Sequence, residues 1–191
     1  GLRLESSLNA VAWYAAAAWR RGADITRGFP GGRDIPCVEM TKTLPPLRLE
    51  IDAERAPDVV AARAVTREAF VRHAEADIVD RLRAEGALVV SLVARIDGIV
   101  VGHVAFSRVQ VCGVNGVLGL GPIAVSPACH RCGVGSRLVE EGLARAREHG
   151  AAAVVVLGES GYYTRFGFTT ASRFGIRYLG ADRHHRHAGA V

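Results

Sequence analysis

The chain has 191 residues, of which 49% are hydrophobic and 23% are charged, a composition that indicates a globular protein with a buried core. Its net charge of +5 rests almost wholly on arginine, since Lys42 is the only lysine. No basic run is interleaved with aromatic residues, so we expect an anionic ligand and not nucleic acid.

Residues 8–19 are apolar and predict a helix that ends before Arg20 and Arg21. This helix would be shorter than the roughly 20 residues needed to cross a bilayer. A signal peptide carries its cations before the apolar run, whereas here the arginine pair follows it. We therefore expect a cytoplasmic protein with no membrane partner.

Residues 22–46 are rich in glycine, proline and charge, a composition typical of a linker or loop. The single methionine, Met40, stands just before the part of the chain that has clear periodicity. We expect the folded unit to start near Met40. On this interpretation residues 1–46 are an N-terminal extension or linker without a catalytic role, and residues 47–176 are the functional domain.

The first part of that domain predicts alternating short elements with a hairpin at its centre. The expected elements are a strand at 47–51, helices at 57–70 and 74–85, and antiparallel strands at 88–96, 99–110 and 118–125. Asp97-Gly98 is a strong hairpin signal between the first two of these antiparallel strands. A glycine-rich turn at residues 111–117 leads into the third.

A further helix is expected to begin on two glycines, Gly133 and Gly135, soon after that third strand. Pro127 stops the strand, and apolar residues then recur at helical spacing until Gly150. The first turn of a helix leaves backbone N–H groups unpaired, and the helix dipole places partial positive charge there. Because glycines let an anion approach the backbone, we predict that the amides of residues 131–136 bind a diphosphate.

Two other phosphate-binding loops do not match this junction. A Walker A loop needs lysine and then serine or threonine after its last glycine, whereas Ser136 and Arg137 follow Gly135. A dinucleotide fingerprint needs glycine or alanine at the position of Leu138. The sequence therefore favours a different kind of phosphate loop.

A wholly apolar run at residues 152–157 follows the helix and predicts a strand buried on both faces. A strand, a crossover helix and a strand in sequence predict that this strand runs parallel to the one at residues 118–125. A short helix is expected over residues 160–166, ending at Gly167.

Two motifs stand in this part of the chain. The first is Val-x-Pro-x-x-(Gln/Arg)-x-x-Gly-x-(Gly/Ala), present as Val125, Pro127, His130, Gly133 and Gly135, and the second is Tyr-x-x-x-Gly-Phe, present as Tyr163, Gly167 and Phe168. Together they resemble the GCN5-related N-acetyltransferases (GNAT family) and their YhbS-like bacterial branch. One departure is His130, because this position usually holds Gln or Arg. The resemblance implies an α/β fold with a mixed sheet, the acyl-CoA N-acyltransferase fold, in the order β-α-α-β-β-β-α-β-α.

The resemblance also implies acetyl-CoA as the co-substrate and assigns roles to residues. Backbone groups of Ile123, Ala124 and Val125 would bind the pantetheine arm. The loop residues that would bind the diphosphate are His130, Arg131, Cys132, Gly133, Val134, Gly135 and Ser136. Tyr163 would donate a proton to the departing thiolate, since a phenol stays protonated at neutral pH. The alternative role for Tyr163 is packing beneath the cofactor, which we expect of Tyr162.

The residue that deprotonates the acceptor amine is not marked by a motif. Glu75, in the second predicted helix, and His103, in the strand before the loop strand, are the candidates. A histidine in an apolar strand is more often a hydrogen-bonded core residue, and a glutamate on a helix is more often solvated. We therefore name two catalytic candidates, Tyr163 as the acid and Glu75 as the base.

The four cysteines do not indicate a disulfide framework in a chain of this length. Cys129 and Cys132 form a C-x-x-C pair of the kind found in redox and zinc sites, but Cys37 and Cys112 do not supply a second pair. We expect no metal. Redox or zinc chemistry at this pair would compete for the turn that the phosphate needs.

Residues 177–191 are polar and lack periodicity, so we expect a disordered tail in place of the last strand or strands of the fold. Its histidines, His184, His185 and His187, are more often solvated than metal-bound. A missing strand would expose a sheet edge, and an exposed edge favours a homodimer.

Taken together, these inferences predict an N-acetyltransferase in which a primary amine attacks acetyl-CoA directly in a ternary complex. The acceptor would be a small-molecule or peptide amine. The competing hypothesis is a catalytically silent acyl-CoA-binding sensor or interaction module, which His130 in the loop and a truncated acceptor side both favour.

Overall fold

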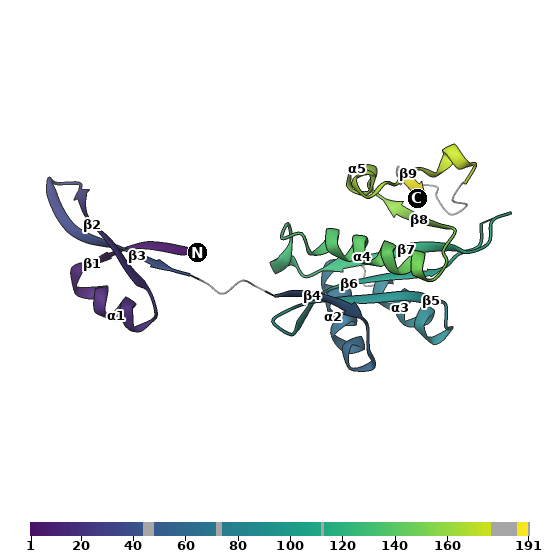
Figure 1. The fold of residues 1–191 in the computed structure, drawn as a ribbon, viewed down its shortest axis with the longest axis horizontal. Helices are drawn as coiled ribbons and strands as arrows, with labels where there is room; N and C mark the ends of the chain where they lie inside the picture. Colours follow the sequence, from purple (N-terminus) through teal and green to yellow (C-terminus); the bar gives the residue numbers. More distant parts are fainter. Residues whose placement is uncertain (44–47, 72–73, 112, 177–186, 191) are drawn as a thin grey trace. The chain divides into compact units, whose positions relative to one another are not determined.

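The computed structural model describes residues 1–43, 48–71, 74–111, 113–176 and 187–190. The chain divides into two compact units, Gly1–Leu47 and Arg48–Val191, each with its own sheet (Figure 1). Within the described residues, no helix combines the length and the apolar character that crossing a membrane requires.

The first unit is a three-stranded antiparallel sheet with β3 at its centre. Its elements are β1 (Leu2–Ser7), a 3-10 turn (Leu8–Ala10), α1 (Val11–Ala16), β2 (Arg20–Phe29) and β3 (Arg33–Lys42). Val38 and Met40 of the central strand are fully buried. Met40, where the folded part was expected to begin, therefore lies in the middle of this sheet.

The linker interpretation of residues 22–46 is wrong for most of that segment, because β2 and β3 occupy it. Pro30, Gly31 and Gly32 form the hairpin turn between these strands, where the N–H of Gly32 donates to the carbonyl oxygen of Phe29 at 3.2 Å. Pro36 is tolerated within β3 because β1 pairs with β3 only from Cys37 onward. The helix expected over residues 8–19 is also shorter, since α1 covers only Val11–Ala16 and a 3-10 turn covers Leu8–Ala10.

The second unit contains the remaining elements. They are β4 (Leu49–Ala53), α2 (Val59–Ala69), α3 (Ala74–Ala84), β5 (Leu88–Ile96), β6 (Ile99–Arg108), β7 (Val117–Val125), α4 (Val134–Glu148), β8 (Ala153–Gly158), α5 (Ser160–Tyr163), β9 (Thr169–Thr170) and β10 (His187–Ala190). Short 3-10 turns precede α2, lie between β7 and α4, and follow α5 and β9.

Seven strands form one mixed sheet in the order β4-β5-β6-β7-β8-β10-β9. Neighbouring strands are antiparallel except β7 and β8, which are parallel. The crossover through α4 accounts for this parallel pair, as the sequence predicted. The predicted fold class and the element order from β4 to α5 are confirmed.

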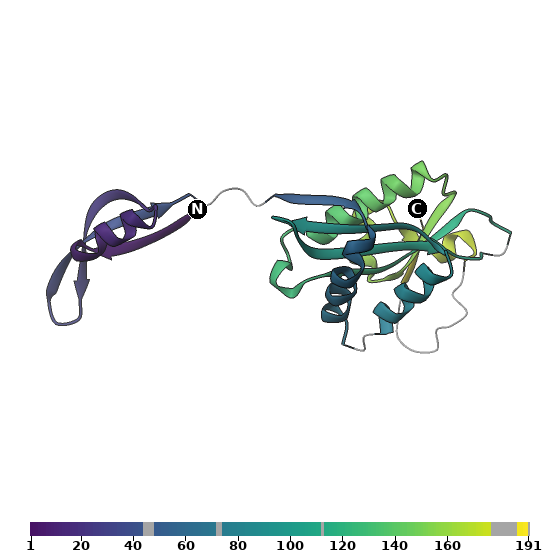
Figure 2. The same cartoon turned by 90° about the horizontal axis from the view of Figure 1, so that it is seen from below.

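Helices α2 and α3 cover one face of the sheet and α4 covers the other (Figure 2). Successive residues of β6 point to opposite faces of the sheet. His103 faces Thr66 of α2, whereas a Cβ added at Gly102 would meet the side chain of Leu138 in α4 at 2.9 Å. A Cβ at Gly142 of α4 would lie 2.3 Å from the ring of Phe106. Glycine at these two positions lets the helix lie directly against the sheet.

Strands β7 and β8 pair over a short length and then separate. Residues 117–120 of β7 pair with residues 153–156 of β8, and Pro122, which has no N–H, stands just beyond the last pair. Residues 123–125 keep their pairing with β6 on one side. Among the described strands they have no partner on the other side, so one edge of β7 is open there.

The C-terminal strand corrects the expectation for residues 177–191. His187–Ala190 form β10, which lies between β8 and β9, so a disordered tail is wrong for these four residues. Residues 177–186 and 191, including His184 and His185, lie outside the described residues. Because β10 pairs with β8, the argument for a homodimer through an exposed edge of β8 no longer holds.

Candidate functional site

The loop between β7 and α4 contains a tight turn followed by a left-handed glycine. His130 has φ −61° and ψ 145°, and Arg131 has φ 60°, which are the φ values of the two central residues of a type II β-turn. Gly133, the N-cap of α4, has φ 81°. Arginine in the left-handed region costs about 1–2 kcal/mol relative to glycine. The fold therefore holds this loop in a shape that its sequence does not favour locally.

This shape leaves a series of backbone amides free. In the part of the chain that the structure describes, the N–H groups of Arg131, Gly133, Val134, Gly135 and Ser136 donate to no protein group. The N–H of Cys132 makes a long contact of 3.4 Å to the carbonyl oxygen of Cys129. Successive amides in a turn and at a helix start form a concave site for anions.

The side chain of His130 reaches back to the end of β7. Its Nε2 lies 3.0 Å from the carbonyl oxygen of Val125. A carbonyl only accepts, so Nε2 carries the proton and donates it. The residue that departs from the usual Gln or Arg thus joins the end of β7 to the start of the turn.

A cavity of about 700 Å³ opens beside this loop. Its lining combines the loop, the open edge of β7, the end of α2 and the α5 region; the residues are Ala69, Phe70, Ile123, Val125, Cys129, His130, Arg131, Gly133, Val134, Gly135, Ser136, Tyr162 and Arg165. The volume is within the range of about 300–1,000 Å³ found for small-molecule sites. Eight of the predicted site residues are thereby brought together: Ile123, Val125, His130, Arg131, Gly133, Val134, Gly135 and Ser136.

The other predicted site residues are not in this lining. Ala124 is 1% exposed and pairs with His103 of β6. Cys132 is exposed at the turn. Only the backbone of Ala124 is therefore available to a ligand at the strand edge.

The two neighbouring tyrosines lie in different places, since Tyr162 lines the cavity and Tyr163 does not. Tyr162 lines the cavity, and a Cβ added at Gly135 would lie 3.0 Å from its hydroxyl oxygen, so it stands over the start of α4. Tyr163 packs against Gly158 at the end of β8, where a Cβ would lie 2.4 Å from its ring. Burial raises the pKa of Tyr163 to about 12, with a smaller contribution from Tyr162. Tyr163 therefore stays protonated at neutral pH.

Arg165 forms the outer wall of the cavity with Tyr162. Its guanidinium lies 4.2 Å from the centroid of the Tyr162 ring, and its Nε donates to the Tyr162 carbonyl oxygen at 2.9 Å. Arg131 and Arg165 together place positive charge at the cavity, which suits an anionic ligand. The sequence reasoning did not identify Arg165, although its place two residues after Tyr163 in the second motif was a usable signal.

His103 is a core residue and not a cavity residue. It is 0% exposed, and its Nε2 lies 3.0 Å from Ser91 Oγ, which is 2.7 Å from Glu54 Oε2. Because a carboxylate only accepts, Ser91 donates to Glu54, and His103 Nε2–H donates to Ser91. The pKa of His103 is lowered to about 4, mainly by burial. The charge of Glu54 opposes this shift, and that of Arg83 adds to it. The imidazole is thus neutral and enclosed near pH 7.

Glu75 lies in the first turn of α3, outside the cavity lining. Its Oε2 is buried and accepts no hydrogen bond from the described residues. A buried carboxylate oxygen without a partner is unusual and is available to a water molecule or a ligand proton. The structure thus leaves Glu75 as a candidate base but does not bring it to this cavity.

A second cavity, of about 1050 Å³, lies at the opposite end of the sheet. It is lined by the start of β7 and the end of α4, including Val117, Leu118, His149 and Gly150. It contains no predicted site residue, so size alone does not identify the functional cavity. Within the described residues, no group of three or more His, Cys, Asp or Glu side chains is arranged to hold a metal ion.

Comparisons with known proteins agree with this geometry. Residues 56–168 match the Acetyltransferase (GNAT) family. The chain is 41% identical over 133 residues to the uncharacterized N-acetyltransferase YhbS of Escherichia coli K12, which covers 69% of this chain and 77% of that protein.

Two solved structures are similar as well. The crystal structure of E. coli YhbS in complex with CoA matches with a TM-score of 0.70 and 38% identity, covering 78% of this chain and 83% of that one. A GNAT family acetyltransferase from Brucella melitensis in complex with acetyl-CoA matches with a TM-score of 0.62 and 40% identity, covering 74% of this chain and 95% of that one. The chain therefore belongs to the GNAT family of acetyltransferases.

Proposed function

We propose that this protein transfers an acetyl group from acetyl-CoA to a primary amine, which attacks the thioester directly in a ternary complex. The observation that carries the proposal is the set of five unpaired amides, from Arg131 to Ser136, at a cavity beside the open edge of β7. The relatives bound to CoA and acetyl-CoA support the choice of cofactor.

The chain's residues fit the cofactor in two places. The free amides of residues 131–136 would hold the diphosphate, with Arg131 and Arg165 adding positive charge at the cavity. The open edge of residues 123–125 would pair with the amide groups of the pantetheine arm, as an added strand pairs with a sheet edge. This arrangement would direct the thioester toward the point where β7 and β8 separate.

The positions of the tyrosines support different roles for them. Tyr163 packs at the end of β8, near the point of separation, and its raised pKa keeps a proton available for the departing thiolate. Tyr162 stands at Gly135 and would form part of the cofactor wall. Free N–H groups at the strand edge would stabilise the charge that develops on the carbonyl oxygen.

Of the two candidate bases, Glu75 suits the role better than His103. His103 does not suit the role, because it is fully buried and its pKa is lowered to about 4. Glu75 retains a carboxylate oxygen without a partner, which supports it as the group that accepts the amine proton. Since Glu75 is not in the cavity lining, this transfer would pass through water.

The acceptor is proposed as a small-molecule or peptide amine. The apolar end of α2, with Ala69 and Phe70, borders the cavity opposite the loop and would face an acceptor. No acidic side chain lines the cavity within the described residues. A neutral amine is therefore better suited to this site than a strongly hydrated ammonium group.

A thiol-release assay with acetyl-CoA and a panel of amines tests the proposal. We expect stoichiometric release of CoA thiol with at least one amine and no burst of thiol in the absence of amine. Calorimetry with acetyl-CoA is done in parallel. Tight binding of acetyl-CoA with no turnover on any amine would contradict the enzyme and favour the catalytically silent module.

A further inference from the structure

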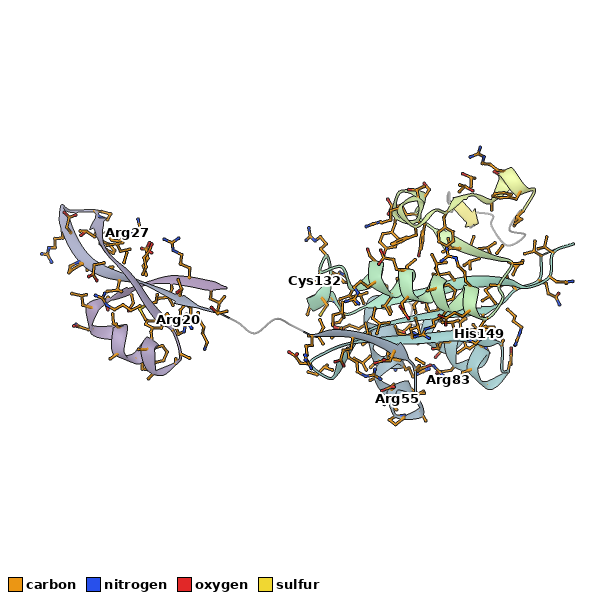
Figure 3. All side chains as sticks on the ribbon, in the orientation of Figure 1. Arg20, Arg27, Arg55, Arg83, Cys132 and His149 are labelled. Carbon is orange, nitrogen blue, oxygen red and sulfur yellow. The ribbon has the colours of Figure 1, made fainter. Side chains whose placement is uncertain are left out.

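We propose that Cys129 and Cys132 form a reversible disulfide that closes the cofactor site under oxidising conditions. The two thiols stand at the first and fourth positions of the turn described above, and both are free in this structure. Cys129 lines the cofactor cavity, and Cys132 is exposed close to the start of α4 (Figure 3). The effect on cofactor binding rests on the proposed function, whereas the cross-link itself does not.

The turn holds the two cysteines at a distance that a disulfide requires. The N–H of Cys132 points to the carbonyl oxygen of Cys129 at 3.4 Å, as in a β-turn that spans residues 129–132. The first and fourth Cα atoms of a β-turn lie within about 7 Å of each other. Disulfide-linked residues have Cα atoms about 4.4–6.8 Å apart, so little backbone movement is needed.

The sulfur of Cys132 already lies over the turn. Its Sγ is 3.5 Å from the carbonyl oxygen of His130, a residue that stands between the two cysteines. A zinc site is a poor alternative, because His130 uses its Nε2 to bind Val125 and no third ligand joins the cysteines among the described residues. The exposed Cys132 and the half-buried Cys129 instead match a redox pair. In such a pair the exposed thiol is oxidised first, and the second thiol then forms the disulfide with it.

The oxidation is balanced with a peroxide as oxidant. The Cys132 thiolate attacks hydrogen peroxide, giving a sulfenic acid on Cys132 and one water after proton uptake. The Cys129 thiol attacks that sulfur, the S–S bond forms, and the second water leaves. Two thiols and one peroxide thus give one disulfide and two waters. A dithiol reductant reverses the reaction, and short exposed disulfides of this kind are readily reduced.

The disulfide would compete with the cofactor for the same residues. It would draw the side chain of Cys129 out of the cavity wall and toward Cys132, and it would lock the turn whose Arg131 amide is proposed to bind the diphosphate. By linkage, a cofactor bound over the turn would slow the oxidation. Redox sensing is the usual role of disulfides in reducing compartments.

Trypsin provides a direct test, because it cleaves after Arg131, between the two cysteines. The full chain is treated with one equivalent of hydrogen peroxide and digested without reductant. We expect a loss of 2 Da in intact mass and one linked peptide pair, residues 109–131 with residues 132–137, which dithiothreitol separates. Because Cys112 lies in the first peptide, the Cys112→Ser variant must give the same pair, and Cys129→Ser must not.

The effect on the site is measured by calorimetry with acetyl-CoA. For each protein the readout is the ratio of dissociation constants between peroxide-treated and dithiothreitol-treated samples. We expect a ratio of at least ten for the parent chain and for Cys37→Ser, and a ratio near one for Cys129→Ser and Cys132→Ser. We also expect acetyl-CoA to slow the formation of the linked peptide.

Three outcomes overturn the inference: no linked peptide in the parent chain, a link that requires Cys112, or a link that leaves acetyl-CoA affinity unchanged. If the reduced protein does not bind acetyl-CoA, the proposed function fails. In that case peptide mapping still decides the cross-link, so the two failures are distinguishable.

Discussion

The Nε2 of His130 lies 3.0 Å from the carbonyl oxygen of Val125, and this hydrogen bond ties the end of β7 to the turn that carries the free amides. Any side chain that can donate from this position serves the same purpose. This explains why a histidine can stand where the family motif usually has Gln or Arg. On the proposed function, the backbone amides of the loop would bind the diphosphate, while the His130 side chain holds the turn in place.

Replacing His130 by alanine removes this donor and is expected to weaken acetyl-CoA binding by about fivefold, since a typical hydrogen bond contributes about 1 kcal/mol. His130→Gln keeps an N–H donor and is expected to bind within about twofold of the parent chain. Calorimetry of the three proteins measures both effects. Equal affinity for the alanine variant and the parent would show that the hydrogen bond does not order the loop.

A side chain at Gly135 would enter the proposed acetyl-CoA cavity. A Cβ there would lie 3.0 Å from the hydroxyl oxygen of Tyr162 and 3.6 Å from Val125 Cγ2. We expect Gly135→Val to weaken acetyl-CoA binding by more than tenfold, which corresponds to more than about 1.4 kcal/mol of binding free energy. The loss in the free energy of unfolding is expected to be smaller than about 1.4 kcal/mol.

Gly161→Val is the matched control for this variant, because a Cβ at Gly161 meets no heavy atom within 4 Å. It is expected to bind acetyl-CoA as the parent chain does. Calorimetry and urea denaturation of both variants separate binding from folding. Unchanged affinity in Gly135→Val would remove the phosphate-binding role from this loop.

The buried His103 predicts a loss of stability in mild acid. Its pKa is about 4 in the folded protein, against an ordinary value of 6.5, so the unfolded chain takes up a proton that the folded chain does not. The free energy of unfolding therefore falls as the pH drops from 6.5 to 4, by up to about 3 kcal/mol. Urea denaturation at pH 7 and pH 5 measures this fall.

The His103→Gln variant removes the titrating group and is expected to show a smaller fall between the same two pH values. Its stability at pH 7 is expected to be lower, because Ser91 loses its ring partner. The comparison therefore uses the change with pH within each protein. An equal change in both proteins would show that His103 does not cause the acid sensitivity.

Asp58 predicts a second, more acidic transition. Its carboxylate forms an ion pair with Arg95 and accepts a hydrogen bond from the N–H of Arg55, and these lower its pKa to about 2. A carboxyl group with a lowered pKa stabilises the fold at any pH above its ordinary pKa of 3.8. This contribution is lost as the pH falls toward 2.

Asp58→Asn is expected to lower the melting temperature at pH 7 more than Asp52→Asn does. The Asp58 side chain is 10% exposed and lies 2.6 Å from Arg95 Nη2, whereas the Asp52 side chain is 62% exposed and 3.3 Å from Arg95 Nη1. Removing the buried partner leaves the Arg95 guanidinium without its main counter-charge. Equal melting temperatures in the two variants would contradict this ranking.

The two tyrosines predict different kinetic effects once an acceptor is known. Tyr163→Phe is expected to lower kcat about a hundredfold, because general acid catalysis typically contributes 10²–10⁴-fold. Tyr162→Phe is expected to change the KM for acetyl-CoA more than kcat. Since the pKa of Tyr163 is about 12, its loss of a proton should produce no alkaline fall in rate below about pH 10. The reverse pattern would assign the acid role to Tyr162.

The second unit was predictable because its patterns are local. Pro127, Gly133 and Gly150 mark the boundaries of the loop and of α4, and the apolar run after α4 predicts a strand parallel to β7. The loop therefore appears in the structure where the motif placed it. The first unit was missed because nine of the ten residues of β2 are exposed, which leaves no alternation of buried and exposed residues to detect.

Other parts of the site depend on packing between distant segments, which spacing along the chain does not reveal. Ala69 and Phe70 reach the cavity because α2 packs on β6 and β7. The enclosure of His103 by Thr66 and Ser91 likewise follows from the sheet and helix α2 coming together. For this reason the cofactor loop could be located from the sequence, whereas the candidate base could not.

The most direct test of the central claim uses the amide signals of the loop glycines. Protein labelled with ¹⁵N in glycine is titrated with acetyl-CoA and, separately, with ADP, which has a diphosphate but no pantetheine arm. We expect the amide signals of Gly133 and Gly135 to shift with both ligands, while those of Gly113 and Gly116, at the opposite end of the sheet, stay in place. If Gly133 and Gly135 do not shift at saturating acetyl-CoA, the loop does not bind the diphosphate.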